Sequence, residues 1–193
     1  MARTKGVLPA MAVLVAMLGA CTGGTSDPTP PTTAPSASAP PAPDGARTLP
    51  CDDSIEQRDD LPEGYSAVLD AVALPFAPGS DRALQAVRDD QEGVPPFWSK
   101  IGLLVRADSG VSLEIDAPER EAVLGWGHAG DPDYFGTAIT TSGCDGDGWL
   151  AFVGGFRVDD PRCLDLIVTT ASAEQPSQVG VGAPCDGQQP PPL

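Results

Sequence analysis

Apolar and polar residues alternate in two neighbouring runs near the middle of the chain. In the first run, Ile101, Leu103 and Val105 fall on one face of an extended strand, with charged residues on the other. The second run, residues 111–116, alternates in the same way, and residues 107–110 between the runs (Ala-Asp-Ser-Gly) have the composition of a turn. The pattern predicts a β-hairpin.

Further short segments have the composition of strands and are separated by Gly, Pro and Asp. They are Tyr65–Leu74, Glu121–Trp126, Phe135–Thr140, Trp149–Val158, Cys163–Thr170 and Gln178–Ala183. Many short strands with frequent turns predict an all-β fold, an antiparallel immunoglobulin-like β-sandwich. Ser80–Asp90 is the one segment that fits a helix, with a Ser cap followed by apolar residues at helical spacing, and it fits a short strand equally well.

The chain begins with a segment typical of exported proteins. Arg3 and Lys5 precede an apolar run of about 12 residues, which is too short to span a bilayer and suits a secretory signal. The run ends in Leu18-Gly19-Ala20-Cys21, which resembles the lipobox of bacterial lipoproteins. The resemblance implies a signal peptide over 1–20, a diacylglyceryl group on the Cys21 thiol, and a domain held at the extracytoplasmic face of the cell membrane. The alternative is an ordinary signal peptide cut after Ala20, which leaves Cys21 as a thiol.

A Pro-rich segment separates this leader from the rest of the chain. Seven of the 25 residues in 22–46 are Pro, and the others are nearly all Thr, Ser, Ala and Gly. Such a segment buries too little apolar surface to offset the entropy of ordering, so 21–47 is expected to be a disordered tether. A β-sandwich domain is expected over 48–187, and a disordered tail over 188–193.

The charge of the chain is strongly negative. The sequence has 11 Lys+Arg against 27 Asp+Glu, a formal net charge of −16. Removing 1–20 removes two cations and no acid, so the exported chain would carry 9 − 27 = −18. This argues against nucleic-acid partners and against a polybasic membrane patch, so the lipid alone would hold the protein to the membrane.

Four cysteines remain once Cys21 is assigned to lipid, and an exported domain is expected to pair them as two disulfides. Suppose that 163–169 and 179–185 form a hairpin that turns at Glu174. Two residues then face each other when their residue numbers add up to 348. Ile167 then opposes Val181, and Cys163 opposes Cys185 on the same face. The remaining pair is Cys51 with Cys144.

Aromatic residues and the single histidine are the candidates for binding. Trp126, His128 and Trp149 are candidate ligand contacts, because an exposed aromatic ring can stack on a sugar or a peptide. Core packing is the default role for a Trp, and a loop position is the default for a lone His. One His excludes a multi-His metal site, and no other cofactor is expected.

Asp145 and Asp147 in the sequence Asp-Gly-Asp-Gly resemble the opening of a calcium loop. The twelfth position of that loop would be Phe156 and not a bidentate Glu. A turn beside Cys144 is therefore the simpler interpretation, and a weak calcium site shared with Asp131 and Asp133 is the alternative.

Three segments together resemble secreted actinobacterial lipoprotein domains that are themselves uncharacterised. They are Cys144–Val158, Pro161–Val168 and Val179–Cys185, and Leu103–Gly127 adds to the resemblance. The resemblance implies an immunoglobulin-like sandwich and assigns no catalytic residue. The Cys-Trp-Cys spacing of true immunoglobulin domains is absent, so only the architecture is implied.

These observations favour a non-enzymatic lipoprotein that binds a protein partner or a component of the cell envelope. The rival hypothesis is an envelope hydrolase that uses acidic residues, for which Asp52-Asp53, Asp89-Asp90 and Asp159-Asp160 are the candidates. Calcium-dependent adhesion is a third possibility. A pocket holding two facing carboxylates near His128 or a Trp would favour the hydrolase, and a closed, shallow surface would favour the binding module.

Overall fold

Twelve β-strands and two short 3₁₀-helices form the part of the chain that the computed structural model describes, residues 40–43, 45–128 and 131–192. The segments expected to form the signal peptide and the tether, up to residue 39 and with Cys21 between them, lie outside the described residues. Within the described ranges, no helix is long and apolar enough to span a bilayer. The elements are β1 (Arg47–Thr48), η1 (Cys51–Asp53), β2 (Glu56–Arg58), β3 (Ser66–Val68), β4 (Val72–Leu74), β5 (Val87–Arg88), β6 (Phe97–Arg106), β7 (Gly110–Ile115), β8 (Ala122–Trp126), η2 (Pro132–Tyr134), β9 (Ala138–Ser142), β10 (Trp149–Val158), β11 (Arg162–Thr170) and β12 (Glu174–Val181).

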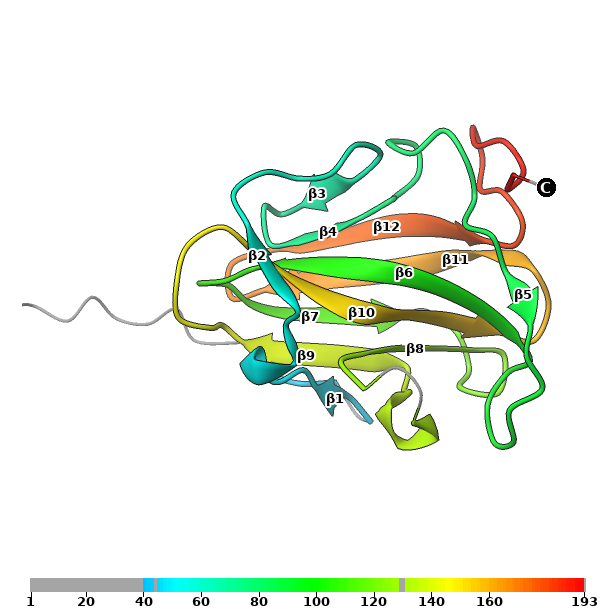
Figure 1. Cartoon of the computed structure of the whole chain (residues 1–193), viewed down its shortest axis with the longest axis horizontal. Helices are drawn as coiled ribbons and strands as arrows, with labels where there is room; N and C mark the ends of the chain where they lie inside the picture. Colours follow the sequence, from blue (N-terminus) through cyan, green and yellow to red (C-terminus); the bar gives the residue numbers. More distant parts are fainter. Residues whose placement is uncertain (1–39, 44, 129–130, 193) are drawn as a thin grey trace, which may run out of the picture. The chain divides into compact units, whose positions relative to one another are not determined.

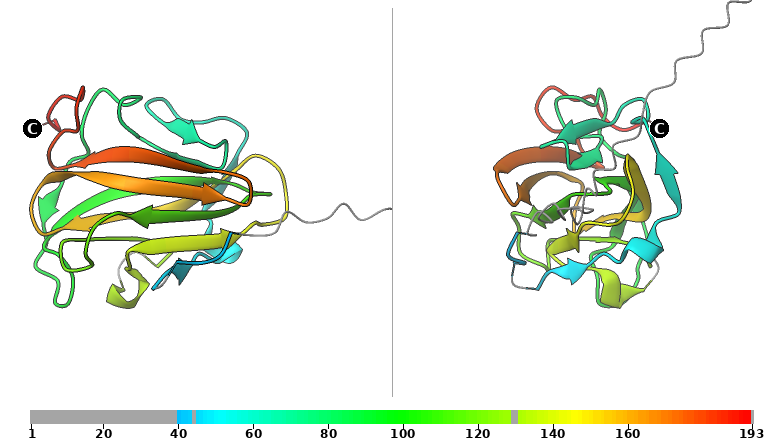
Figure 2. Two further views of the ribbon diagram at one scale, coloured as in Figure 1. Left: turned by 180° about the vertical axis from the view of Figure 1, so that it is seen from behind. Right: turned by 90° about the vertical axis from the view of Figure 1, so that its left-hand side faces the viewer.

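The strands form two sheets that face each other (Figures 1 and 2). The first sheet has the order β1-β9-β7-β11-β12, and the second has the order β2-β10-β6-β4-β3, with β5 also paired to β6 and β8 to β10. Neighbouring strands are antiparallel, apart from the two-residue pairing of β1 with β9. The predicted antiparallel β-sandwich is therefore confirmed, in the sense of two packed antiparallel sheets.

The hydrophobic core lies between the sheets. Leu103 on β6 and Phe152 and Phe156 on β10 point inward from the second sheet, and Leu113 on β7 and Leu166 on β11 point inward from the first. These side chains are at most 1% exposed. Side chains an even number of positions apart along a strand share a face, as Phe152 and Phe156 do, so the alternation seen in the sequence is the alternation of core and outer positions.

The hairpin expected over residues 101–116 is wrong, because β6 and β7 lie in opposite sheets. Residues 107–109 cross from one sheet to the other and bond to the β9–β10 loop, with Ala107 N donating to Gly148 O over 3.0 Å. From β6 to β11, each strand lies in the sheet opposite its predecessor. A strand across the core buries an apolar face as well as a paired neighbour does, so alternation alone does not identify the partner.

Several predicted strands match the structure closely, and one predicted segment does not. The bounds of β10 are those predicted, and Tyr65–Leu74 divides into the hairpin of β3 and β4. Ser80–Asp90 forms no helix. It is extended, with β5 at Val87–Arg88 and isolated bridges from Arg82 and Leu84, so the strand interpretation was the better one.

The register predicted for β11 and β12 is also wrong, although the disulfide it led to is present. The residue numbers of the observed partners add up to 343 and not to 348, as for Cys163 with Gly180 and Leu164 with Val179. A shift of five positions is odd, so it moves the other set of side chains onto the core face. On β11, Leu164 therefore points inward, where the prediction placed Ile167. On β12, Val179 and Val181 lie on the core face, as in the prediction.

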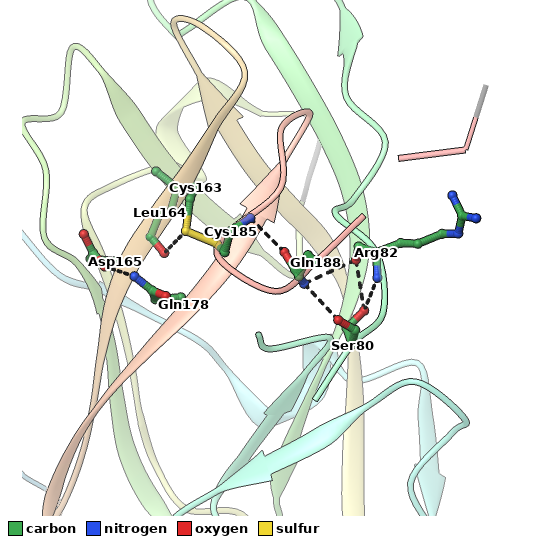
Figure 3. Close-up of a disulfide and its surroundings, with 8 residues drawn as sticks. All are labelled: Ser80, Arg82, Cys163, Leu164, Asp165, Gln178, Cys185 and Gln188. Carbon is green, nitrogen blue, oxygen red and sulfur yellow. Dashed lines mark hydrogen bonds between the residues drawn. A yellow bond between two sulfur atoms is a disulfide. The ribbon is translucent and has the colours of Figure 1, made fainter. Parts of the chain in front are cut away.

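Cys163 meets Cys185 because the chain leaves β12 after Val181 and folds back (Figure 3). Gly182 has a φ of 71°, and a Cβ there would lie 2.8 Å from Pro161. Only glycine suits that backbone conformation at that distance. The bend lets Cys185 approach Cys163 to a Cα–Cα distance of 4.8 Å.

Residues after the disulfide belong to the folded domain, although the sequence placed them in the tail. The Gln188 side chain donates to Ser80 O and accepts from Cys185 N, and Gln189 N donates to Asp81 O over 2.8 Å (Figure 3). These bonds tie the start of the extended segment Ser80–Asp90 to the end of the chain, and Leu84 N, which donates to Gly180 O over 2.8 Å, joins the same segment to the edge of β12.

The second disulfide joins Cys51 to Cys144 with a Cα–Cα distance of 5.7 Å. It ties η1 to the loop between β9 and β10. Both predicted pairings are thus confirmed, and each bridge joins segments that the strand ladders do not connect.

Candidate functional site

An open groove of about 820 Å³ lies over the outer face of β8. Five separate segments line it: β1, the loop between β5 and β6, the loop between β7 and β8, β8 itself, and η2 with the residue after it. In Figure 1, β1 and the short yellow-green helix η2 lie at the lower edge of the domain, below β8. The volume of the groove is in the range of small-ligand sites, about 300–1,000 Å³.

The floor of the groove is apolar. Val123 alternates with the core residues Ala122 and Leu124, so its side chain points to the outer face. Phe135 lies beside it, because Gly136 pairs with Leu124 and extends the sheet past β8. A Cβ on Gly125 would lie 3.0 Å from the Phe135 ring, so a glycine there lets the ring lie on the strand.

A buried arginine holds one wall of the groove. The Arg157 side chain is 3% exposed and lies on β10. Its Nη1 donates to Asp89 O (3.1 Å) and Pro95 O (3.3 Å), and its Nη2 donates to Asp89 Oδ2 (2.5 Å) and Gln91 Oε1 (2.7 Å). These bonds fix both ends of the β5–β6 loop, whose residues 93–96 form the wall.

Two aromatic rings complete this support. The Arg157 guanidinium lies 5.3 Å from the Trp98 ring centre and 5.5 Å from that of Phe135. The two rings meet edge to face at 5.6 Å. Trp98 is half-buried on the outer face, and sequence reasoning missed both it and Arg157, because neither is part of a motif. The only signal was an arginine within an otherwise apolar strand.

The charged lining of the groove is balanced. Arg47 and Arg120 supply two cations, and Glu119 and Asp133 supply two carboxylates. Arg47 is positioned by a hydrogen bond from its Nε to Phe135 O (3.3 Å). Asp133 lies in η2, where the sequence Asp131-Pro132 favours a helical start: Asp131 Oδ1 accepts from Asp133 N, and Pro132 takes the first turn.

His128 lies beside the groove and forms a small cluster of its own. Its Nδ1 is 3.1 Å from Asp53 Oδ2, and its ring stacks on Tyr134 with centres 4.6 Å apart. The Asp53 side chain is 15% exposed and that of His128 is 59% exposed. Gly127, with a φ of 93°, brings the chain against Asp53. Tyr134 separates this cluster from Asp133 in the groove, so the sequence candidate His128 belongs to the rim.

The two predicted tryptophan candidates are buried and offer no free face. Trp126 is 2% exposed, packs edge to face on Phe156 and donates from Nε1 to Ile101 O (2.9 Å). Trp149 is 3% exposed and lies under Arg106, whose guanidinium is 4.5 Å from the ring centre. The default of core packing holds for both.

Trp149 belongs to a second apolar cluster, on the outer face of the second sheet, with Ala73, Leu104 and Tyr65. The Tyr65 hydroxyl donates to Gly102 O over 3.0 Å. Burial raises the pKa of Tyr65 above its usual value, because the phenolate would be poorly solvated there.

The proposed calcium residues lie in separate places. Asp131 and Asp133 precede β9, whereas Asp145 and Asp147 follow it, in the loop beside the Cys51–Cys144 disulfide. The described residues hold no group of three or more His, Cys, Asp or Glu side chains arranged for a metal ion. Gln57 Nε2 donates to Asp147 O, which is the contact expected of a turn.

At least one member of each predicted acidic pair has a structural partner. Asp89 bonds to the buried Arg157, and Asp90 pairs with Arg88 at 2.8 Å. Asp53 bonds to His128, and Asp159 pairs with an arginine on β11. The carboxylates that share the groove are instead Glu119 and Asp133, which no sequence pattern linked. No protein-family model, curated protein or solved structure matches the chain.

Proposed function

We propose that the chain is a lipid-anchored, non-enzymatic binding module at the extracytoplasmic face of a bacterial cell membrane, and that the groove is its binding site. The observation that carries the proposal is the groove, with an apolar floor, charged walls and a buried arginine that holds one wall in place. A site formed in advance in this way costs less ordering entropy on binding.

The two disulfides support an exported domain, because such bonds persist in oxidising compartments. The lipobox ending at Cys21 supports the anchor. The net charge of −16 disfavours nucleic acids and acidic polymers as ligands and favours neutral, zwitterionic or cationic ones.

The anchor is tested by the Cys21→Ala variant of the full chain, expressed in a bacterium that lipidates exported proteins. The variant should lose incorporation of labelled palmitate and leave the membrane fraction, or accumulate as an uncut precursor. Thr22→Ala is the matched control and should behave as the wild type. Unchanged labelling and membrane retention in Cys21→Ala would refute the anchor.

A hydrolase is the second candidate, because Glu119 and Asp133 line one groove. Its test is the release of product from chromogenic glycosides by the full chain. Turnover that is lost in both Glu119→Gln and Asp133→Asn would favour the hydrolase over the binding module.

A further inference from the structure

Arg47 is electrostatically unusual among the cations of the domain. Nine Lys and Arg side chains lie in the described residues, and six of them form ion pairs with carboxylates. The other three, 9 − 6, are Arg47, Arg82 and Lys100. Of these, Arg47 alone lines the groove.

The Arg47 side chain is oriented but not neutralised. Its Nε bond to Phe135 O holds the guanidinium at the apolar floor and leaves the two Nη groups without a carboxylate among the described residues. A guanidinium held in this way matches a carboxylate with two parallel hydrogen bonds. A ligand carboxylate placed there would bring the group next to it against the accessible apolar lining, which is Val94, Pro96 and Pro132.

Glu119 and Asp133 give the groove the opposite charge elsewhere on its lining. Neither carboxylate forms an ion pair within the described residues, and both side chains are exposed. They would repel a second anion and attract a cation. A ligand that satisfies both kinds of wall carries a carboxylate, an apolar group and a cationic group.

We propose that the groove binds the carboxyl-terminal end of a short zwitterionic peptide. This proposal rests on the proposed function, in which the groove is the binding site. The terminal carboxylate pairs with Arg47, and an upstream cationic side chain faces the acidic lining. The apolar side chain of the last residue lies against the accessible apolar lining, which is Val94, Pro96 and Pro132. A neutral sugar fits less well, because it would leave Arg47, Glu119 and Asp133 without a partner of opposite charge.

The test uses the full chain in detergent and isothermal titration with acetyl-Lys-Ala-Ala-Leu, as the free acid and as the C-terminal amide. The free acid should bind about tenfold more tightly, which corresponds to about 1.4 kcal/mol. Arg47→Gln should remove this preference, and Arg47→Lys should retain part of it, because lysine keeps the charge without the two-pronged geometry.

Lys100→Gln is the matched control, since it removes the same charge outside the groove lining and should keep the tenfold preference. Thermal unfolding of each variant checks that the fold is kept. Equal binding of acid and amide, no binding of either by the wild type, or equal loss in Arg47→Gln and Lys100→Gln overturns the inference. These results leave the anchor test with Cys21→Ala untouched, so failure of the two proposals is distinguishable.

Discussion

Replacing Arg157 by methionine tests whether the buried guanidinium holds the groove wall. Methionine keeps an unbranched apolar stem between Trp98 and Phe135 but removes the four hydrogen bonds to the β5–β6 loop. The carbonyls of Asp89 and Pro95 and the Gln91 side chain then lose their shared donor.

The expected cost follows from the exposure of the two partners. Removing one member of a buried ion pair costs about 3–5 kcal/mol, chiefly because the remaining charge is left without solvent. Here the remaining Asp89 carboxylate is 51% exposed and regains water. The guanidinium has also lost its hydration, and its Nε has no hydrogen-bond partner in the described part of the chain. We therefore expect the lower end, about 3 kcal/mol.

The assay is urea unfolding with the disulfides intact, followed by tryptophan fluorescence, with the midpoint and slope compared between variants. Arg88→Met is the control, because Arg88 and Asp90 are 63% and 68% exposed and lie in the same loop region. An exposed pair contributes at most about 1 kcal/mol. If Arg157→Met costs no more than Arg88→Met, the argument that Arg157 holds this wall is refuted.

Three further predictions concern the bridges and the buried rings. Cys163→Ser should lower the free energy of unfolding by about 3 kcal/mol and Cys51→Ser by about 4.5 kcal/mol, because the two bridges close separations of 22 and 93 residues. Equal losses in urea unfolding would contradict this explanation from chain entropy. Tyr65 has a raised pKa, so the folded state holds this proton more tightly than the unfolded chain; the associated stability is complete below about pH 10 and falls as the pH rises through the folded pKa. Tyr65→Phe should therefore lose less stability at alkaline pH than the wild type, measured by urea unfolding across that range. Trp126→Phe should cost about 2–3 kcal/mol, because it opens a small cavity and leaves Ile101 O without its indole donor, and a melt unchanged from the wild type would argue against this.

The sequence did not predict which tryptophan rings are exposed at the candidate site. Trp126 and Trp149 were singled out by residue type, yet both are buried, while the half-buried Trp98 was overlooked. Ring exposure depends on which strand position faces outward and on what covers that face. For Trp149 the cover is Arg106, which comes from the paired strand β6.

The disulfides show a correct pairing reached through an incorrect register. Four cysteines in an exported domain permit few pairings, so the bridge between Cys163 and Cys185 was within reach of the sequence. The odd shift in register and the bend at Gly182 were not, because they depend on how β12 packs against its neighbours. The groove has the same origin, since its five segments are brought together only by the fold.

The sequence by itself determined the fold class and most strands, because these follow from local composition and from alternation along one strand. It also led to both cysteine pairs, but through a register that the structure does not have. Only the tertiary structure decided that β6 and β7 face each other across the core, and that Arg157, Phe135 and Arg47 meet at one groove. The physical reason is that an apolar face is buried equally well by several partners. Packing over the whole domain selects the partner, and the sequence of a single strand does not indicate which partner that is.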